Sequence, residues 1–135
     1  MHWAAQYIGL PWSRDGEGPE SYHCWAFVRM VQARQFGRAL PAIPNPGDLL
    51  PLARAFRDHA ERARWPRVET PAEGDCVLLR CARYPVHVGV WVGAAATGGV
   101  LHCAEGAGVV YQRPAALAAN GWRIEGFYRF AGEGE

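Results

Sequence analysis

Five short runs of β-branched and aromatic residues in the second half of the chain constrain the fold more than any other feature of the sequence. Turn-forming residues separate the runs, which lie at residues 76–81, 86–93, 99–104, 108–113 and 123–130. Runs of these residue types predict short β-strands. A meander of short strands favours antiparallel pairing, so one antiparallel sheet is expected.

The first half of the chain has a helical pattern instead. Helices are expected at residues 2–9, 21–36 and 49–65, and a proline-rich irregular stretch at residues 40–48. The second helix carries apolar side chains at helical spacing along one face: Cys24, Phe27, Val28 and Val31. Gly37 can end it. Helices followed by strands indicate an α+β fold, with N-terminal helices packed on a five- to six-stranded, mainly antiparallel sheet.

Size and charge narrow the classes of function. The 135 residues, half of them apolar, fit a single domain spanning residues 1–135. With 14 basic and 13 acidic side chains the net charge is +1, which does not favour nucleic acid or an anionic membrane as a partner. The N-terminus lacks the pattern of a signal peptide, and no segment has the roughly 20 apolar residues of a membrane span, so we expect synthesis in the cytoplasm.

The run at 86–93 alternates strictly, which places His87 on the face opposite its valines. If this strand pairs with the next one through the glycine-rich loop at 93–99, a register with Gly89 opposite His102 brings both histidines to one face. Their side chains are then diagonal neighbours that can meet.

Together, Cys24, His87 and His102 predict the active site of a thiol hydrolase. A helix N-terminus and a nearby imidazole both lower the pKa of a thiol, so Cys24 is expected to be an activated nucleophile. His87 is then the general base, and His102 holds the ring of His87 in its productive orientation.

Two alternatives to a catalytic role exist for the cysteines and histidines: a structural role in the core and zinc binding. A cysteine on an apolar face is usually a small core residue, which is how we interpret Cys76, Cys81 and Cys103. Zinc binding by cysteines and histidines of the segment 81–103 is disfavoured, because His102 and Cys103 are adjacent in one strand and point to opposite faces. No metal is therefore expected.

Four segments resemble, in order and spacing, the signature blocks of the NlpC-type cell-wall peptidases, a papain-like cysteine hydrolase family: "YHCWAFVRMV", "EGDCVLLR", "HVGVWVG" and "LHCAEGAG". The resemblance extends from about Tyr7 to Phe130. It is strongest to the branch encoded with phage tails, in which "IGLPW" precedes the nucleophile, tryptophan follows it, and "GFYR" closes the domain.

This resemblance implies a peptidase that needs no cofactor and cleaves peptidoglycan stem peptides, typically between D-glutamate, through its γ-carboxyl, and a diamino acid. It assigns Cys24 as nucleophile, His87 as base and His102 as orienting residue. It also implies action in the periplasm or cell wall, as part of a phage or phage-like particle with tail proteins as partners.

Three positions depart from the family pattern. His23 stands where aspartate is common, Ala26 where glycine is often found, and Trp12 where many relatives have a tyrosine that assists the oxyanion. Trp12, His23 and Trp25 are the candidates for oxyanion and substrate contacts. The departures keep one alternative open, a catalytically weak or inactive tail-tip or peptidoglycan-binding component. A secreted antibacterial amidase toxin built on the same fold is a further alternative.

Overall fold

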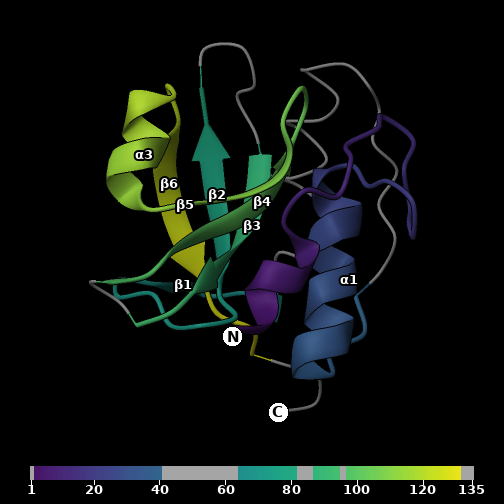
Figure 1. The fold of residues 1–135 in the computed structure, drawn as a ribbon. Coiled ribbons are helices and arrows are strands. Elements are labelled where there is room, and N and C mark those ends of the chain that lie inside the picture. Colours follow the sequence, from purple (N-terminus) through teal and green to yellow (C-terminus); the bar gives the residue numbers. More distant parts are fainter. Residues whose placement is uncertain (1, 41–63, 82–86, 95–96, 132–135) are drawn as a thin grey trace.

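The computed structural model describes residues 2–40, 64–81, 87–94 and 97–131 and shows helices on both sides of a six-stranded antiparallel sheet (Figure 1). The helical elements are the 3₁₀ helix η1 (Trp3–Tyr7), α1 (Cys24–Phe36) and α3 (Pro114–Ala119). The strands are β1 (Arg67–Val68), β2 (Cys76–Arg80), β3 (His87–Val92), β4 (Gly99–Ala104), β5 (Gly108–Gln112) and β6 (Arg123–Tyr128). The α+β fold expected from the sequence is confirmed.

The strand order in the sheet is β1-β6-β2-β3-β4-β5. β2 to β5 form the expected meander, and β6 returns to pair with β2 on the other side. All five predicted strands are present with slightly shorter bounds. β1 and α3 were not predicted, because two residues are too few to show alternation and α3 is a single short run of alanine and leucine after Pro114.

The helix α1 covers one face of the sheet, and the larger of the two apolar clusters lies on that face. Phe27, Val28 and Val31 are fully buried against β3 and β4. Gly37 ends the helix in the left-handed conformation, with φ 66°, which glycine adopts at low cost. The predicted helix at 2–9 is the shorter η1, and the one predicted at 49–65 lies outside the described residues.

The opposite face of the sheet is covered by α3 and by the segment that leads into β6. Leu117 of α3 is buried in a second apolar cluster with Val77, Leu79, Trp91 and Val100. Every residue of β3 and β4 is consequently buried. Polar side chains on the α3 face of these two strands are therefore removed from water, and they need partners within the protein.

A buried polar cluster joins α1 to the start of β2. The carboxylate of Asp75, which is 4% exposed, accepts hydrogen bonds from Arg129 at 2.9 and 3.0 Å and from the backbone N–H of Ala72 at 2.8 Å. Gln32 of α1 donates to the carbonyl of Gly74 at 2.9 Å. The cluster fixes where β2 begins relative to α1.

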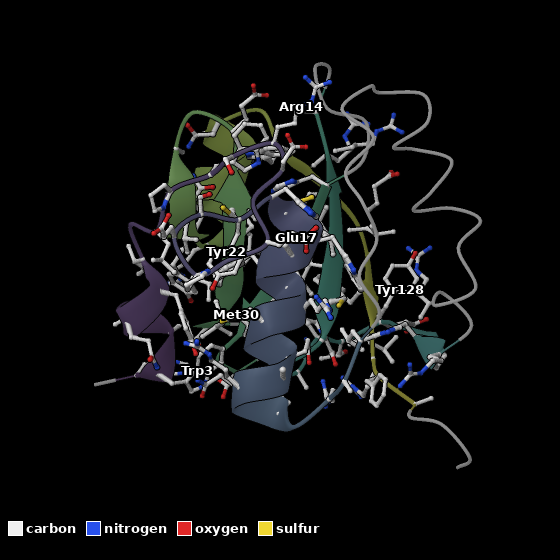
Figure 2. All side chains as sticks on the ribbon, turned by 90° about the vertical axis from the view of Figure 1, so that its right-hand side faces the viewer. Trp3, Arg14, Glu17, Tyr22, Met30 and Tyr128 are labelled. Carbon is white, nitrogen blue, oxygen red and sulfur yellow. The ribbon has the colours of Figure 1, made fainter. Side chains whose placement is uncertain are left out.

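The N-terminal segment is attached to the sheet beside the C-terminal half of α1. Glu73 accepts from His2 at 2.9 Å, from the Trp3 indole at 3.1 Å and from the N–H of Gly93 at 2.9 Å. Trp3 also packs edge-on against Phe36, and Figure 2 shows Trp3 at the far end of α1 from Arg14. No helix among the described residues is long and apolar enough to cross a membrane.

Replacing Arg129 with methionine leaves the buried carboxylate of Asp75 without its cation, and we expect the free energy of unfolding to fall by about 2–3 kcal/mol. The control is Arg80→Met, which removes an exposed ion pair with Glu125 at 3.7 Å and should change stability by less than about 0.5 kcal/mol. Urea unfolding at pH 7 measures both. Equal losses in the two variants would contradict the role given to Asp75.

Candidate active site

The helix α1 begins at Cys24 because His23 caps its N-terminus. His23 has an extended backbone, and its Nδ1 accepts a hydrogen bond from the N–H of Ala26 at 3.4 Å. Since Nδ1 accepts, the proton of a neutral ring is on Nε2, which donates to the carboxylate of Glu17 at 3.1 Å. The His23 side chain is 2% exposed, so both nitrogens are engaged within the fold.

The sulfur of Cys24 faces backbone N–H groups from two elements. Those of Cys24 and Trp25 belong to the first turn of α1, and that of Val88 belongs to β3; all three favour a negative charge on the sulfur. Burial has the larger effect and raises the pKa of Cys24 to about 11. The thiol pKa therefore moves opposite to the sequence-based expectation, and the resting group is a neutral thiol.

The two histidines meet on the α3 face of the sheet. In the sheet, Val90 of β3 lies opposite Leu101 of β4. Extending this antiparallel register by one residue places Gly89 opposite His102, as expected from the sequence. Nε2 of His87 and Nδ1 of His102 are 2.9 Å apart. The absent side chain of Gly89 permits this approach, because a Cβ there would lie 2.9 Å from that of His102 and 2.5 Å from Cγ1 of Val100.

Two further residues complete the surroundings of the histidine pair, and sequence reasoning missed both. Oε1 of Gln112 in β5 lies 2.8 Å from Nε2 of His102. The Trp122 indole stacks on the His87 ring, with centroids 4.6 Å apart, and stands edge-on to His102. The alternation of faces along the predicted strand at 108–113 could have indicated Gln112. Trp122 lies between α3 and β6, in a segment whose sequence has no periodic pattern.

The histidine pair is kept neutral at pH 7. Burial lowers the pKa of His87 well below its ordinary value, and the neighbouring His102 lowers it further by charge repulsion. Burial also lowers the pKa of His102, against an opposing effect of its hydrogen bond to Gln112. A neutral His87 has one ring nitrogen with a lone pair, which is what a general base requires.

The sulfur of Cys24 reaches β3 at the residue that follows His87, although the side chain of His87 points to the opposite face of the strand. The sulfur of Cys24 receives the N–H of Val88, the residue directly after His87. Nε2 of His87 is directed at His102, and among the described residues Nδ1 has no hydrogen-bond partner. The structure therefore pairs His87 with His102 and places the sulfur of Cys24 at the neighbouring residue Val88. The pairing leaves Nδ1 as the nitrogen of His87 that has no partner among the described residues.

The other candidate residues are placed differently. Trp12 forms a parallel bridge with Tyr22, two residues before Cys24, and its side chain packs partly buried against the core. Trp25 is buried in the core cluster around α1. A hydrogen bond from His23 to an oxyanion would have to replace its bond to Glu17 or Ala26. The orphan N–H of Cys24 remains as a donor in the first turn of α1.

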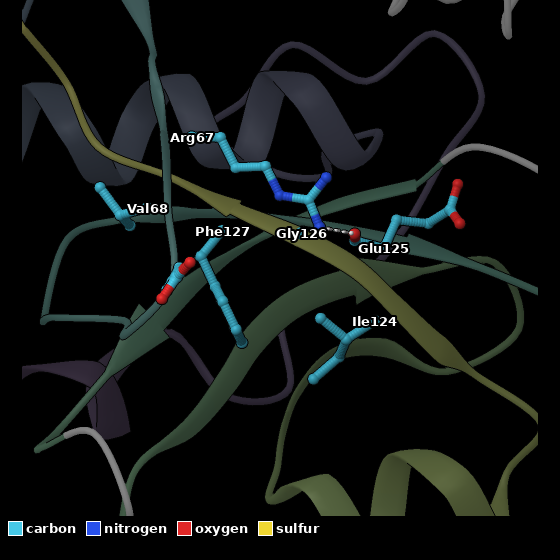
Figure 3. Close-up of a pocket in the computed structure, with 7 residues that line it drawn as sticks. Arg67, Val68, Ile124, Glu125, Gly126 and Phe127 are labelled. Atoms are coloured by element: carbon cyan, nitrogen blue, oxygen red, sulfur yellow. Dashed lines mark hydrogen bonds between the residues drawn. The ribbon is translucent and has the colours of Figure 1, made fainter.

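Two further features are a surface groove on the edge of the sheet and the thiol of Cys103, which lies near Cys24. A groove of about 540 Å³ follows β1 and β6 (Figure 3) and is lined by Arg67, Val68, Glu69, Ile124, Glu125, Gly126 and Phe127. None of these side chains is a nucleophile of a thiol hydrolase. Cys103 donates to the carbonyl of Tyr22 at 3.3 Å on the α1 face, opposite to His102, as the argument against zinc expected.

Comparison with known proteins agrees with this architecture. One of 11 matching solved chains is the crystal structure of the NlpC/p60 domain of peptidoglycan hydrolase SagA, with 20% identity, a TM-score of 0.59, and coverage of 94% of this chain and 92% of that chain. No curated protein sequence matches the chain. A model of the NlpC/P60 family matches residues 9–122. The chain therefore belongs to the NlpC/P60 family of papain-like cysteine peptidases.

Proposed function

We propose that this peptidase hydrolyses amide bonds in peptidoglycan stem peptides, with Cys24 as nucleophile, His87 as general base and His102 as the residue that orients His87. The observation that carries the proposal is the hydrogen-bonded pair of buried neutral histidines beside a thiol at a helix N-terminus. Family membership supports the class of reaction. The scissile bond proposed, between D-γ-glutamate and a diamino acid, is the one implied by the sequence resemblance.

The first step follows from the protonation states. Because Cys24 rests as a thiol, its proton passes to Nδ1 of His87 as the sulfur attacks the peptide carbonyl. The positive charge on His87 is then shared with His102 through their 2.9 Å hydrogen bond. The oxyanion is stabilised by the N–H of Cys24, and Trp12 is the side chain proposed to stand beside it; one such donor typically contributes ~10²–10³ in rate.

The second half of the reaction uses the same groups in reverse. His87 protonates the leaving amine, which departs and leaves the acyl group on Cys24. Water enters, gives a proton to His87, and attacks the acyl-enzyme. The acid is released, and the thiol recovers its proton. Apart from the peptide substrate and water, the proposed sequence uses only groups of this chain.

The biological setting that we propose is the bacterial cell wall, reached as part of a phage or phage-like tail. The sequence segments "IGLPW" and "GFYR" and the tryptophan after the nucleophile support it. In this setting the whole chain acts as one peptidase domain. Digestion of purified muropeptides, with products identified by mass spectrometry, tests the bond, and the proposal fails if no D-γ-glutamyl product is released.

Cys24→Ala removes the nucleophile, and we expect it to abolish release of stem-peptide fragments while the thermal unfolding midpoint stays within a few degrees of the wild type. Cys76→Ala, at a buried cysteine that pairs with Val90 at the opposite end of β2 from the Leu79–His87 pair, is the matched control and should retain activity. Residual turnover in Cys24→Ala at the wild-type rate would rule out the mechanism.

His87→Ala removes the base, so we expect kcat to fall by about 10²–10⁴-fold. His102→Ala removes the orienting group but leaves the base, so its loss in kcat should be smaller. The exposed His2, which pairs with Glu73, provides the control: His2→Ala should leave kcat unchanged. An unaffected His102→Ala enzyme would exclude His102 from the site.

The buried thiol and imidazole predict a definite pH dependence. Since the pKa of Cys24 is raised to about 11, alkylation by iodoacetamide should be slow at pH 6 and accelerate as the pH rises toward that value. Since the pKa of His87 is lowered, kcat/KM should fall only when the pH drops below 6.5 and the base takes up a proton. Proton transfer during attack also predicts slower turnover in D₂O.

The Cys24→Ala variant gives the background alkylation rate of the three other cysteines. Rapid modification of Cys24 at pH 5, with no further increase above it, would demonstrate a preformed thiolate and imidazolium pair. That result would contradict the neutral resting state.

A further inference from the structure

Among the residues that the structure describes, Gln112 is the side chain hydrogen-bonded to Nε2 of His102, the nitrogen that points away from His87. The register of β4 and β5 pairs His102 with Val110 and Val100 with Gln112. Gln112 is therefore the diagonal neighbour of His102 on the same face, where cross-strand side chains reach each other. Its Oε1 lies 2.8 Å from Nε2 of His102. Gln112, His102 and His87 thus form a line of hydrogen bonds across three adjacent strands.

Because Gln112 presents its oxygen Oε1, and not its NH₂ group, to His102, the position of every proton in this line is determined. An amide oxygen only accepts, so Nε2 of His102 must carry a proton and donate it to Gln112. The other nitrogen of a neutral His102, Nδ1, then accepts. It can accept only from Nε2 of His87, 2.9 Å away, so His87 also carries its proton on Nε2. The lone pair of His87 is left on Nδ1.

The alternative arrangement would disable the proposed base. If His102 carried its proton on Nδ1, it would donate to His87, and the neutral His87 would carry its own proton on Nδ1. The nitrogen left for the thiol would then have no lone pair to accept a proton. In other hydrolases an orienting residue that imposes the wrong tautomer reduces kcat by ~10⁴.

Water has little access to correct the tautomer. His102 is fully buried, His87 is 6% exposed, and Trp122 stacks over one ring and stands against the other. A neutral imidazole in solution exchanges its two tautomers freely, whereas a buried one keeps the tautomer that its partners select. The selecting partner at the end of this line is Gln112.

We infer that Gln112 is a positioning residue that sets the tautomer of both histidines, and so places the lone pair of His87 on the nitrogen facing Cys24. This inference rests on the proposed function for its catalytic consequence, but the tautomers themselves can be measured without any substrate. Gln112 acts through His102 and touches neither the thiol nor the peptide.

The test compares three variants of the full chain at pH 8, where both histidines are neutral. Gln112→Leu removes the acceptor at nearly the same volume. Gln112→Glu keeps an acceptor oxygen on a side chain of the same length and serves as the rescue. Gln35→Leu is the matched control, since it removes a glutamine side chain that donates to the hydroxyl of Tyr7 at 2.7 Å.

Long-range ¹H–¹⁵N spectra of histidine-labelled protein report which nitrogen of each ring is protonated. The wild type, Gln112→Glu and Gln35→Leu should show Nε2–H on His87 and His102, whereas Gln112→Leu should show Nδ1–H forms of both. Kinetically, Gln112→Leu should lower kcat by at least about 10–100-fold, the usual effect of removing an outer partner of a functional histidine, and by up to ~10⁴-fold where the wrong tautomer is fully populated, with KM little changed. Gln112→Glu should restore kcat to within a few-fold.

Nδ1–H on His87 in the wild type would overturn the inference, as would unchanged tautomers and kcat in Gln112→Leu. Equal loss of kcat in the Leu and Glu variants would also overturn it, because a missing acceptor could not then be the cause. If the wild type hydrolyses no muropeptide, the proposed function fails. The spectra of Gln112→Leu still decide the role of Gln112 in that case.

Discussion

The hydrogen bond between His87 and His102 is the interaction on which the candidate site depends. It joins two neighbouring strands, and it forms only because Gly89 has no side chain to separate them. A shift of one residue in the pairing of β3 and β4 would place the two rings on opposite faces. The sheet register, which is itself fixed by the apolar residues on the α1 face, is therefore a condition for the chemistry.

Burial gives this site its resting state. It raises the pKa of the Cys24 thiol and lowers the pKa of both imidazoles, so each group is held in its neutral form. A thiol and a neutral base store no charge in a low-dielectric interior, where an unpaired charge is costly. Charge develops only as the sulfur attacks, when the helix N-terminus, the N–H of Val88 and the second histidine can each stabilise it.

His23 stands where aspartate is common in the family, and Glu17 helps the histidine to fill the position by bonding to its ring. His23 caps α1 through Nδ1, and Glu17 accepts the proton on its other nitrogen, so the pair leaves Nδ1 as the acceptor that an N-cap requires. The same logic recurs at the other histidines, where Gln112 accepts from His102. In both places an acceptor oxygen of a neighbouring side chain determines which nitrogen of a buried ring carries the proton.

The sequence by itself determined the α+β fold, the five main strands, the place of Cys24 near the N-terminus of α1 and the shared face of His87 and His102. Periodicity and turn residues act locally, and the alternation of side chains along a strand assigns them to faces. Tertiary structure alone decided the rest. β1 and α3 are too short to leave a pattern, and Trp122 reaches His87 from a connection without periodicity. The thiol pKa was expected to fall and instead rises, because the extent of burial depends on everything packed around the sulfur and cannot be read from its neighbours in the chain.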